Sequence, residues 1–313
     1  MNRYFIGIVL TFMSLFGAIA HSKTWPEKEI TMIVPFPAGG TVDRIARSFA
    51  EDLPKLVNKP VIVKNVPGAN SIAAINELLN NDPNHTFIVS LGSLVYTSIA
   101  TNSNLYLELL PNMIVGSSRT ALFKNKTANT TEFLQGVRSN VPVLITSGDT
   151  VDNGQMWLLS MENTNMQMVP FKGAPDMIRS VMQNEPKWGS CSIFCIWNFV
   201  KNEQIDVAFV GGDKRSQFLP NVPTAKELGL KAQPYNFDSI YLIASNRRIQ
   251  PEVAEQMNAA LRKVGTTNAN IQNFGKVGLD LDLTNIVESA KIWRDQEQMA
   301  QFYFRKQLTT KTK

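Results

Sequence analysis

Strand-like and helix-like segments alternate along this chain from residue 30 onward, and that order restricts it to an α/β fold. The first expected helix covers residues 42–57 and carries one apolar stripe at steps of three and four, formed by Ile45, Phe49, Leu53 and Leu56. Further helices are expected at 71–81, 153–161 and 176–183, and from residue 250 onward. Strands are expected at 30–35, 60–64, 86–91, 141–146, 167–171, 205–210 and 238–244. This βαβ order predicts mostly parallel sheets covered by helices.

The alternating pattern occurs in two sets, separated by residues 102–120, where we expect irregular structure. We place a crossing between two lobes near residues 115–123, and a later strand brings the chain back. A mature chain of 293 residues (313 − 20) is long enough for two domains of roughly 100 to 200 residues each. The prediction is a first lobe of residues 21–118 and 238–313 and a second lobe of residues 119–237, with a cleft between them.

Residues 1–20 have the layout of a secretory signal peptide. Arg3 gives a short basic start, residues 4–16 are nearly all apolar, and residues 18–20 form a small-x-small cleavage signal. The alternative is an uncleaved membrane anchor, which needs about 20 apolar residues, and this run is shorter than that. We therefore expect cleavage near Ala20 and export of the mature chain to the periplasm.

Charge and motif content exclude several classes of function. Without residues 1–20 the chain has 30 basic residues (31 − 1) and 26 acidic ones, so the formal charge falls from +5 to +4. The Lys and Arg residues form no run or stripe, so nucleic acid is not an expected partner. The histidines are His21 and His85, and no nucleophile elbow, zinc, P-loop or dinucleotide motif occurs. We expect neither enzyme activity nor a metal or cofactor.

Cys191 and Cys195 are the two cysteines of the chain, four residues apart. If residues 192–201 are helical, two Cα atoms one turn apart lie near the upper limit of disulfide reach. An oxidising compartment permits that bond. The other interpretation, which we favour, is a pair of small buried hydrophobic residues.

Four motifs, in order along the chain, identify a family. They are Trp25-Pro-Glu-Lys-Glu-Ile-Thr-Met-Ile-Val-Pro-Phe-Pro-Ala-Gly-Gly40 with Asp43 and Ala46-Arg47, Pro60-Val-Ile-Val-Lys-Asn-Val-Pro-Gly-Ala69, Val169-Pro-Phe-Lys-Gly-Ala174, and Lys214-Arg-Ser-Gln-Phe-Leu-Pro-Asn-Val-Pro-Thr-Ala-Lys-Glu-Leu-Gly229. Together they resemble the Bug/TctC-type receptors, the periplasmic solute-binding proteins of tripartite tricarboxylate transporters. The resemblance implies a monomeric, two-lobed periplasmic binding protein of type II (Venus-flytrap) architecture. Such a protein closes on a small carboxylate, either a di- or tricarboxylate, an amino acid or an aromatic acid, and delivers it to integral-membrane permease subunits.

Within the first lobe, the resemblance points to three loops that follow strands. A helix that begins after a Gly-rich turn leaves backbone N–H groups free for an anion, although a plain strand-to-helix turn is the alternative for Gly39-Gly40. Ser71 either caps the next helix, which we favour, or donates to a ligand. Val42 replaces the family's usual Thr or Ser, and Asn70 and Ser71 replace glycines. The candidate ligand-binding residues here are Phe36, Ala38, Gly39, Gly40, Thr41, Asp43, Gly68, Ala69, Ser71, Gly92 and Ser93.

The second lobe departs further from the family pattern, since Ser190-Cys-Ser192 replaces the common Phe-Asp-Asn. Asp149 stands where the family has a small residue, so it either favours an amine- or nitrogen-bearing acid or is a solvated loop residue. Lys172 either neutralises an acidic ligand or is a surface charge. The candidates in this lobe are Ser147, Asp149, Thr150, Lys172, Gly173, Cys191 and Ser192. All these loops are expected on one rim, because ligands of open α/β sheets lie at the carboxyl ends of strands.

Two further interpretations complete the prediction. Thr224 and Glu227 have the spacing of a capping box, for which we expect no ligand role. The departures at 42, 70, 71 and 190–192 leave an alternative function open, in which the receptor has lost transport and acts as a ligand sensor. The sequence names neither the ligand nor the permease.

Overall fold

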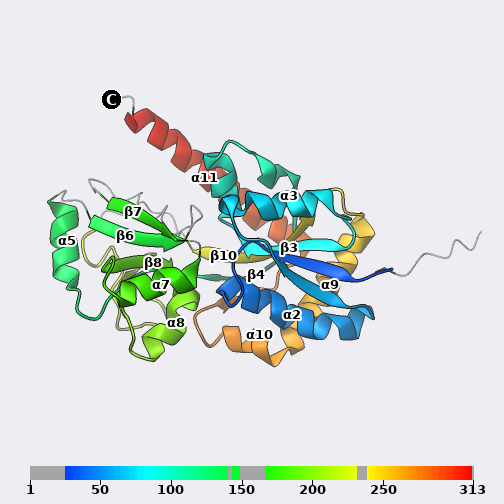
Figure 1. Cartoon of the computed structure of the whole chain (residues 1–313), viewed down its shortest axis with the longest axis horizontal. Helices are drawn as coiled ribbons and strands as arrows, with labels where there is room; N and C mark the ends of the chain where they lie inside the picture. The colour runs from blue at the N-terminus through cyan, green and yellow to red at the C-terminus, as the bar shows by residue number, and fades with distance from the viewer. Residues whose placement is uncertain (1–24, 140–142, 149–165, 172, 231–237, 312–313) are drawn as a thin grey trace, which may run out of the picture.

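Two β-sheets lie side by side along the long axis of the molecule, each with helices on its faces (Figure 1). The computed structural model describes residues 25–139, 143–148, 166–171, 173–230 and 238–311. We call the elements built around the six-stranded sheet the first lobe, and those built around the five-stranded sheet the second lobe. The expected signal peptide and the expected helix at 153–161 lie outside the described residues.

The first-lobe sheet has the strand order β11-β4-β10-β3-β1-β2. β1 pairs in parallel with β2 and β3, whereas β10 runs antiparallel to both β3 and β4. β2, β1, β3 and β4 therefore all run in one direction, and only the pairs made by β10 and β11 make this described sheet mixed. The strand bounds are β1 Ile30–Val34, β2 Val61–Asn65, β3 Thr86–Leu91, β4 Leu109–Ser118, β10 Ser239–Asn246 and β11 Asp280–Leu281.

The second-lobe sheet has the order β7-β6-β8-β5-β9. β6 is parallel to β7 and β8, and β5 is antiparallel to β8 and β9. The bounds are β5 Thr120–Lys124, β6 Val143–Gly148, β7 Met166–Phe171, β8 Trp188–Ser192 and β9 Asp206–Val210. β6, β7 and β9 follow the expected strands at 141–146, 167–171 and 205–210 within about two residues, which is the usual uncertainty of strand ends, whereas β5 and β8 were not predicted.

Helices cover both faces of the first-lobe sheet (Figure 1). One face carries α2 (Thr41–Val57), α9 (Pro251–Thr267) and α10 (Ala269–Phe274), and the other carries α3 (Ile72–Asn80), α4 (Leu94–Ala100) and α11 (Ile286–Lys311). In the second lobe α5 (Thr130–Arg138) packs on one face, and α7 (Ala174–Met182) and α8 (Ile193–Lys201) pack on the other. None of the helices in the described residues has the length and apolar character needed to span a membrane.

The expected apolar stripe of α2 is buried except at its end. Ile45, Phe49 and Leu53 are fully buried, but Leu56 is 41% exposed. The prediction for Leu56 was wrong because it lies in the last turn, beside exposed Lys55 and Asn58, where the helix ends.

Residues 102–120 are not irregular, contrary to the prediction. They contain β4, a ten-residue strand that lies between β10 and β11 and is buried along most of its length. Pro111 and Asn112 interrupt its apolar pattern. Pro111 is tolerated because the register with β10 shifts between Ile243 and Ala244, and Ala244 is the partner of Pro111.

The chain passes from the first sheet to the second between Ser118, the end of β4, and Thr120, the start of β5. It returns to the first sheet with β10 from Ser239. We propose that the lobe boundaries follow this change of sheet, with residues 21–118 and 238–313 in the first lobe and 119–237 in the second.

Candidate ligand-binding site

The loop between β1 and α2 presents an uncapped helix start. Gly40 occupies the N-cap position of α2 and offers no side-chain cap. Gly39 has φ +84°, a left-handed conformation that favours glycine. The first N–H groups of α2 are therefore left without a capping side chain, which is the arrangement that binds anions at helix N-termini.

Asp43 holds this loop in shape from within. Its carboxylate is 2% exposed; Oδ2 accepts hydrogen bonds from the N–H of Gly39 at 2.8 Å and from Nε of Arg47 at 2.9 Å. Nδ2 of Asn65 donates to Oδ1 at 2.9 Å and to the carbonyl oxygen of Phe36 at 3.0 Å. Burial acts to raise the pKa of Asp43, but the hydrogen bonds from Arg47, Gly39 and Asn65 outweigh it, so the pKa lies below its ordinary value. This carboxylate is occupied by its own loop.

The second loop, between β2 and α3, has a strained backbone. Gly68, Ala69 and Ser71 all have positive φ, at +110°, +49° and +68°. Ala69 to Ser71 form the 3₁₀ turn η1, and Ser71 occupies the N-cap position of α3 without making a cap bond. The favoured capping role of Ser71 was therefore wrong, because a capping residue needs an extended backbone to aim its oxygen at the first N–H groups.

Hydroxyl groups without partners lie near these loops. Ser71 is 1% exposed, and its Oγ makes no hydrogen bond. Ser90, near the end of β3, is fully buried, and its Oγ also makes none. Ser90 was not among the predicted residues, because a serine inside an apolar strand gives no signal of its own.

The third loop follows β3 and contains Gly92 and Ser93. The N–H of Gly92 donates to the carbonyl oxygen of Ile240 at 2.8 Å, and a Cβ on Gly92 would lie 3.3 Å from Cβ of Ile240. Gly92 therefore lets β10 come close. Ser93 stands at the N-cap of α4 and makes no side-chain cap bond.

The second lobe reaches the first loop through Gly173. This residue occupies the N-cap of α7, which has no side-chain cap, and a Cβ placed on it would lie 3.3 Å from Cδ of Pro37. The structure thus brings two predicted loops, one from each lobe, into contact. Asp149, Thr150 and Lys172 lie outside the described residues.

Ser147 lies in β6, where its backbone pairs in register with Pro170 of β7. The backbone alone of this residue is described, so its part in a site stays a prediction.

The turn from β8 into α8 is closed by a disulfide between Cys191 and Cys195, with Cα atoms 6.2 Å apart. The favoured interpretation of two unbonded residues was wrong. Cys191 is the second-to-last residue of β8 and Cys195 lies in the first turn of α8, and the change of direction between strand and helix brings them within reach. Between them, Ser192 accepts a hydrogen bond from the N–H of Cys195 at 3.3 Å. Oγ of Ser192 also lies 2.8 Å from the hydroxyl oxygen of Tyr241 on β10. Tyr241 was not foreseen.

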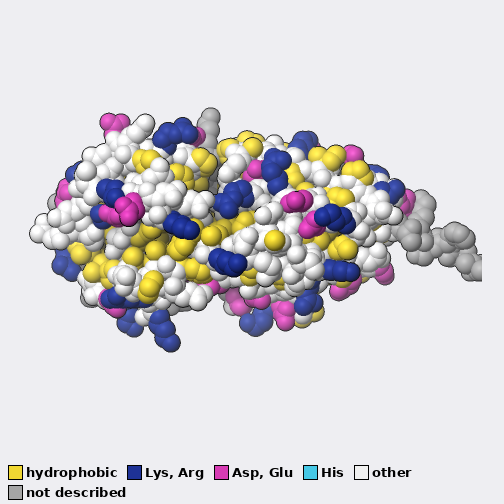
Figure 2. All heavy atoms as spheres, turned by 90° about the horizontal axis from the view of Figure 1, so that it is seen from below, with side chains coloured by type: hydrophobic (Ala, Val, Ile, Leu, Met, Phe, Trp, Pro, Cys, Tyr) yellow, Lys and Arg dark blue, Asp and Glu magenta, His cyan; other side chains and the backbone are white. Residues whose placement is uncertain are grey.

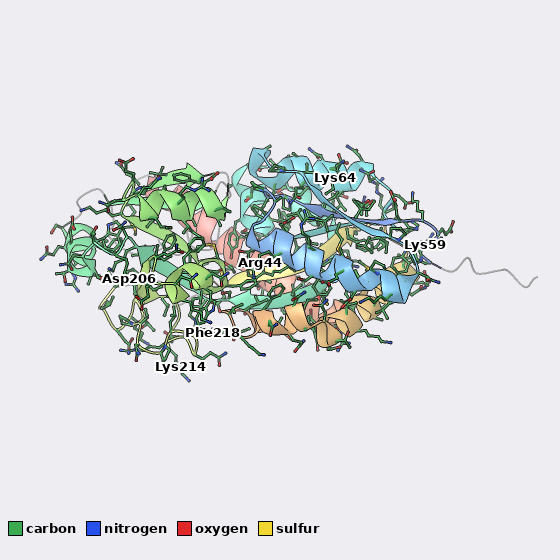
Figure 3. All side chains as sticks on the ribbon, turned by 60° about the horizontal axis from the view of Figure 1, so that its bottom comes forward. Arg44, Lys59, Lys64, Asp206, Lys214 and Phe218 are labelled. Atoms are coloured by element: carbon green, nitrogen blue, oxygen red, sulfur yellow. A yellow bond between two sulfur atoms is a disulfide. The ribbon has the colours of Figure 1, made fainter. Side chains whose placement is uncertain are left out.

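The lobes also pack together beside this turn. Phe194 of α8 contacts the rings of Tyr241 and Phe274, with centroids 5.5 and 5.2 Å apart. The guanidinium carbon of Arg44 lies 5.7 Å from the ring centroids of both Phe194 and Phe274. Figure 3 shows Arg44 near the start of α2, at the junction of the lobes. The first turns of α2 and α8 therefore lie close to each other.

A cavity of about 400 Å³ lies outside these loops, between α2 and α10. Its lining residues are Arg44, Arg47, Ser48, Glu51, Asn270, Asn273, Phe274 and Val277. The described residues contain no group of His, Cys, Asp and Glu side chains that fits a metal ion. On the face seen in Figure 2, Lys and Arg are interspersed with other side chains, and apolar side chains gather in the second lobe and at its junction with the first.

Thr224 and Glu227 form the predicted capping box. The N–H of Thr224 donates to Oε2 of Glu227 at 2.7 Å, and the N–H of Glu227 donates to Oγ1 of Thr224 at 3.1 Å. The residues that follow form turns instead of the helix that a capping box usually begins.

A family model described as "Tripartite tricarboxylate transporter family receptor" matches residues 45–305. The chain belongs to this receptor family. Because the matched range begins at Ile45, the loop 36–43 lies just before it. The family comprises receptors that bind a solute, so the expectation that the chain is not an enzyme is confirmed.

Solved structures similar to this receptor confirm its fold as that of a periplasmic binding protein. MatC from Rhodopseudomonas palustris, solved with bound malate, has a TM-score of 0.80 at 18% identity, covering 89% of this chain and 99% of MatC. The periplasmic binding protein BugD has a TM-score of 0.78 at 18% identity, with 90% and 98% covered. A second R. palustris protein, solved with adipate, has a TM-score of 0.78 at 18% identity, with 90% and 97% covered.

Proposed function

We propose that this receptor captures a small dicarboxylate between its two lobes in the periplasm and delivers it to the membrane subunits of a tripartite tricarboxylate transporter. The observation that carries the proposal is the meeting of two uncapped helix starts: α2 from the first lobe and α7 from the second approach each other where Gly173 faces Pro37. Each helix start carries a partial positive charge of about half a unit. Two such starts suit the two ends of a dicarboxylate.

The ligands of related structures support the same class. MatC was solved with malate and its R. palustris relative with adipate, and both are dicarboxylates. In this receptor, the groups that we propose to contact the ligand are the backbone N–H groups at residues 40–41 and at Gly173, together with the hydroxyl of Ser71. We assign Asp43, Gly92 and Cys191 to holding the loops in place, because their side chains or close contacts are used within the protein.

The export signal supports the location, and the family supports the transporter. Residues 1–20 have the pattern of a cleaved signal peptide, and receptors of this family serve tripartite transporters. We propose a monomer that hands its ligand to integral-membrane permease subunits.

The test is thermal unfolding of the exported protein after refolding free of carried-over ligand, with malate, succinate, adipate, citrate, glutamate and benzoate as additives. A ligand at a hundredfold excess over its Kd stabilises the folded state by about 2.7 kcal/mol. A rise in Tm with dicarboxylates is the expected result. A flat response to the whole panel would refute the proposal and favour a receptor that no longer binds a carboxylate.

A further inference from the structure

Ser71 has a buried hydroxyl without a hydrogen-bond partner and a left-handed backbone, and both features lower the stability of the fold. Its hydroxyl is buried, at 1% exposure, and Oγ has no hydrogen-bond partner. A buried hydroxyl without a partner lowers stability, because it has given up hydrogen bonds with water. Such groups in folded proteins call for an explanation, and a bound ligand is one.

The backbone conformation of Ser71 is also unfavourable. Its φ of +68° and ψ of −4° lie in the left-handed region, which disfavours residues with a Cβ. Most non-glycine residues with positive φ in the described chain are asparagines, which tolerate this region. The full set is Asn58, Ala69, Ser71, Asn102, Asn104, Asn184 and Glu203. A serine held in a strained conformation and buried without a partner points to a role in function.

The position of Ser71 is at the edge of the first lobe that carries the ligand loops. It ends the turn after Gly68, and the preceding strand β2 lies next to β1. Asn65, at the end of β2, is tied to the first loop through Phe36 and Asp43. The turn η1 also packs against α4, which follows β3. Ser71 therefore belongs to the same group of strand exits as Gly40 and Gly92.

The chemistry of the hydroxyl identifies the class of ligand. On the proposed function, the two carboxylates of a dicarboxylate lie at the helix starts of α2 and α7, and Ser71 belongs to neither. Its Oγ both donates and accepts, so it suits a hydroxyl group carried between the two carboxylates. Resting on the proposed function, we propose that Ser71 is a specificity-determining residue that makes this receptor prefer hydroxy-substituted carboxylates over the unsubstituted acids of the same length.

The ratio of the two Kd values can be estimated from the Ser71 hydroxyl, which stays without a hydrogen-bond partner when the unsubstituted acid binds. One neutral hydrogen bond, together with the penalty for leaving its partner unsatisfied, corresponds to about a tenfold difference in Kd. The wild-type receptor should therefore bind malate about ten times more tightly than succinate, and citrate about ten times more tightly than tricarballylate.

Titration calorimetry on Ser71→Gly tests this proposal. Glycine removes the hydroxyl and accepts φ +68° without strain, so the variant should fold at least as stably as the wild type. The expected result is a malate-to-succinate preference close to one, caused by weaker binding of malate. Glu203→Gly is the matched control, because Glu203 also has positive φ, at +54°, but is exposed in the second lobe. Its preference should equal that of the wild type.

The outcomes separate this inference from the proposed function. If the wild type binds none of the four acids, the proposed function is refuted, and with it the role of Ser71 that rests on it. If the wild type binds dicarboxylates without preferring the hydroxylated member, or if Ser71→Gly weakens malate and succinate equally, the receptor stands and the role of Ser71 in selection is refuted. An unchanged preference in Ser71→Gly refutes it as well.

Discussion

Replacing Asp43 by Asn tests the idea that this carboxylate holds the ligand loop in shape. Asp43 accepts three hydrogen bonds, from Gly39, Arg47 and Asn65, and is 2% exposed. In Asp43 both carboxylate oxygens accept hydrogen bonds. An asparagine has one acceptor oxygen and one NH₂ group, so its NH₂ group would face an N–H donor. The variant therefore keeps the shape of the side chain but cannot satisfy all three partners.

The magnitude follows from these contacts. Loss of one charge-assisted hydrogen bond costs about 1.5–3 kcal/mol, and a buried donor left facing another donor costs about 1–3 kcal/mol. The Arg47 side chain is 54% exposed, so its pairing with Asp43 contributes at the low end. We expect Asp43→Asn to lower the free energy of unfolding by about 3 kcal/mol, or Tm by roughly 6–12 °C.

The dependence on pH gives an independent readout. The pKa of Asp43 is lowered in the folded state, so its stabilisation is present above the unfolded pKa of about 3.9 and is lost as pH falls through the lower folded value. The difference in stability between wild type and Asp43→Asn should therefore be constant near neutral pH and shrink below about pH 4. Chemical unfolding at a series of pH values measures it.

Asp206→Asn is the matched control, because Asp206 is part-exposed, bonds to Lys124 at 3.2 Å and lies in the second lobe (Figure 3). Solvent screens a pair whose carboxylate is 46% exposed, so its loss should cost about 1 kcal/mol even though the Lys124 side chain is 13% exposed. The reasoning is refuted if Asp43→Asn is no more destabilising than Asp206→Asn, or if its effect persists unchanged below pH 4.

Three further predictions concern the contacts between the lobes and the second-lobe turn. Gly173→Val adds bulk where even a Cβ would lie 3.3 Å from Cδ of Pro37. Overpacking of about 1–3 kcal/mol should weaken dicarboxylate binding, measured by calorimetry, roughly 5- to 150-fold, and more than Gly173→Ala does. Binding as tight as that of the wild type would contradict a close approach of the lobes at this contact. Replacing both Cys191 and Cys195 by Ser removes a disulfide that closes a short loop, and should lower the free energy of unfolding by up to about 2 kcal/mol. The variant should have a lower Tm than the wild type, and reductant should not change it. A Tm equal to that of the wild type would show that the disulfide does not stabilise the protein. Tyr241→Phe and Ser192→Ala remove the two ends of a 2.8 Å hydrogen bond, and a double-mutant cycle should give a coupling of about 0.5–1.5 kcal/mol, whereas additive effects would argue against the bond.

The sequence was sufficient for part of the regular structure, but β5 and β8 were not predicted. Apolar periodicity located the stripe of α2, and runs of β-type residues located β1, β3 and β10, because these features depend on neighbours a few positions apart. β4 was not predicted, because its identification depends on residues far away in the sequence. Pro111 and Asn112 look like loop residues until the register shift beside Ala244 and the hydrogen bond from Nδ2 of Asn258 to the carbonyl oxygen of Asn112 are known. Both of those features depend on residues more than a hundred positions away.

The contact between two candidate loops was easier to predict than the state of their side chains. The approach of Gly173 to Pro37 brings together loops that the strand exits had suggested. The state of each side chain depended on backbone conformation that the sequence does not reveal. Ser71 resembled a cap until its positive φ was seen, and the disulfide of Cys191 depended on where a strand ends and a helix begins.

Charge has little to do with how the described part of this site would recognise an acid. On the proposed function, the first-lobe loops contact the ligand through backbone N–H groups and hydroxyls, because the Asp43 carboxylate is paired with Arg47. Groups of this kind contribute less to affinity than a bidentate arginine, but they discriminate by position, because each must meet a particular oxygen of the ligand. On the same proposal, a change of ligand requires a change at a few uncharged positions, such as residue 71, while the Asp43 network keeps the loop in place. Changes at such positions leave the order of strands and helices untouched, which is why that order predicts the fold class of the receptor and leaves its ligand unnamed.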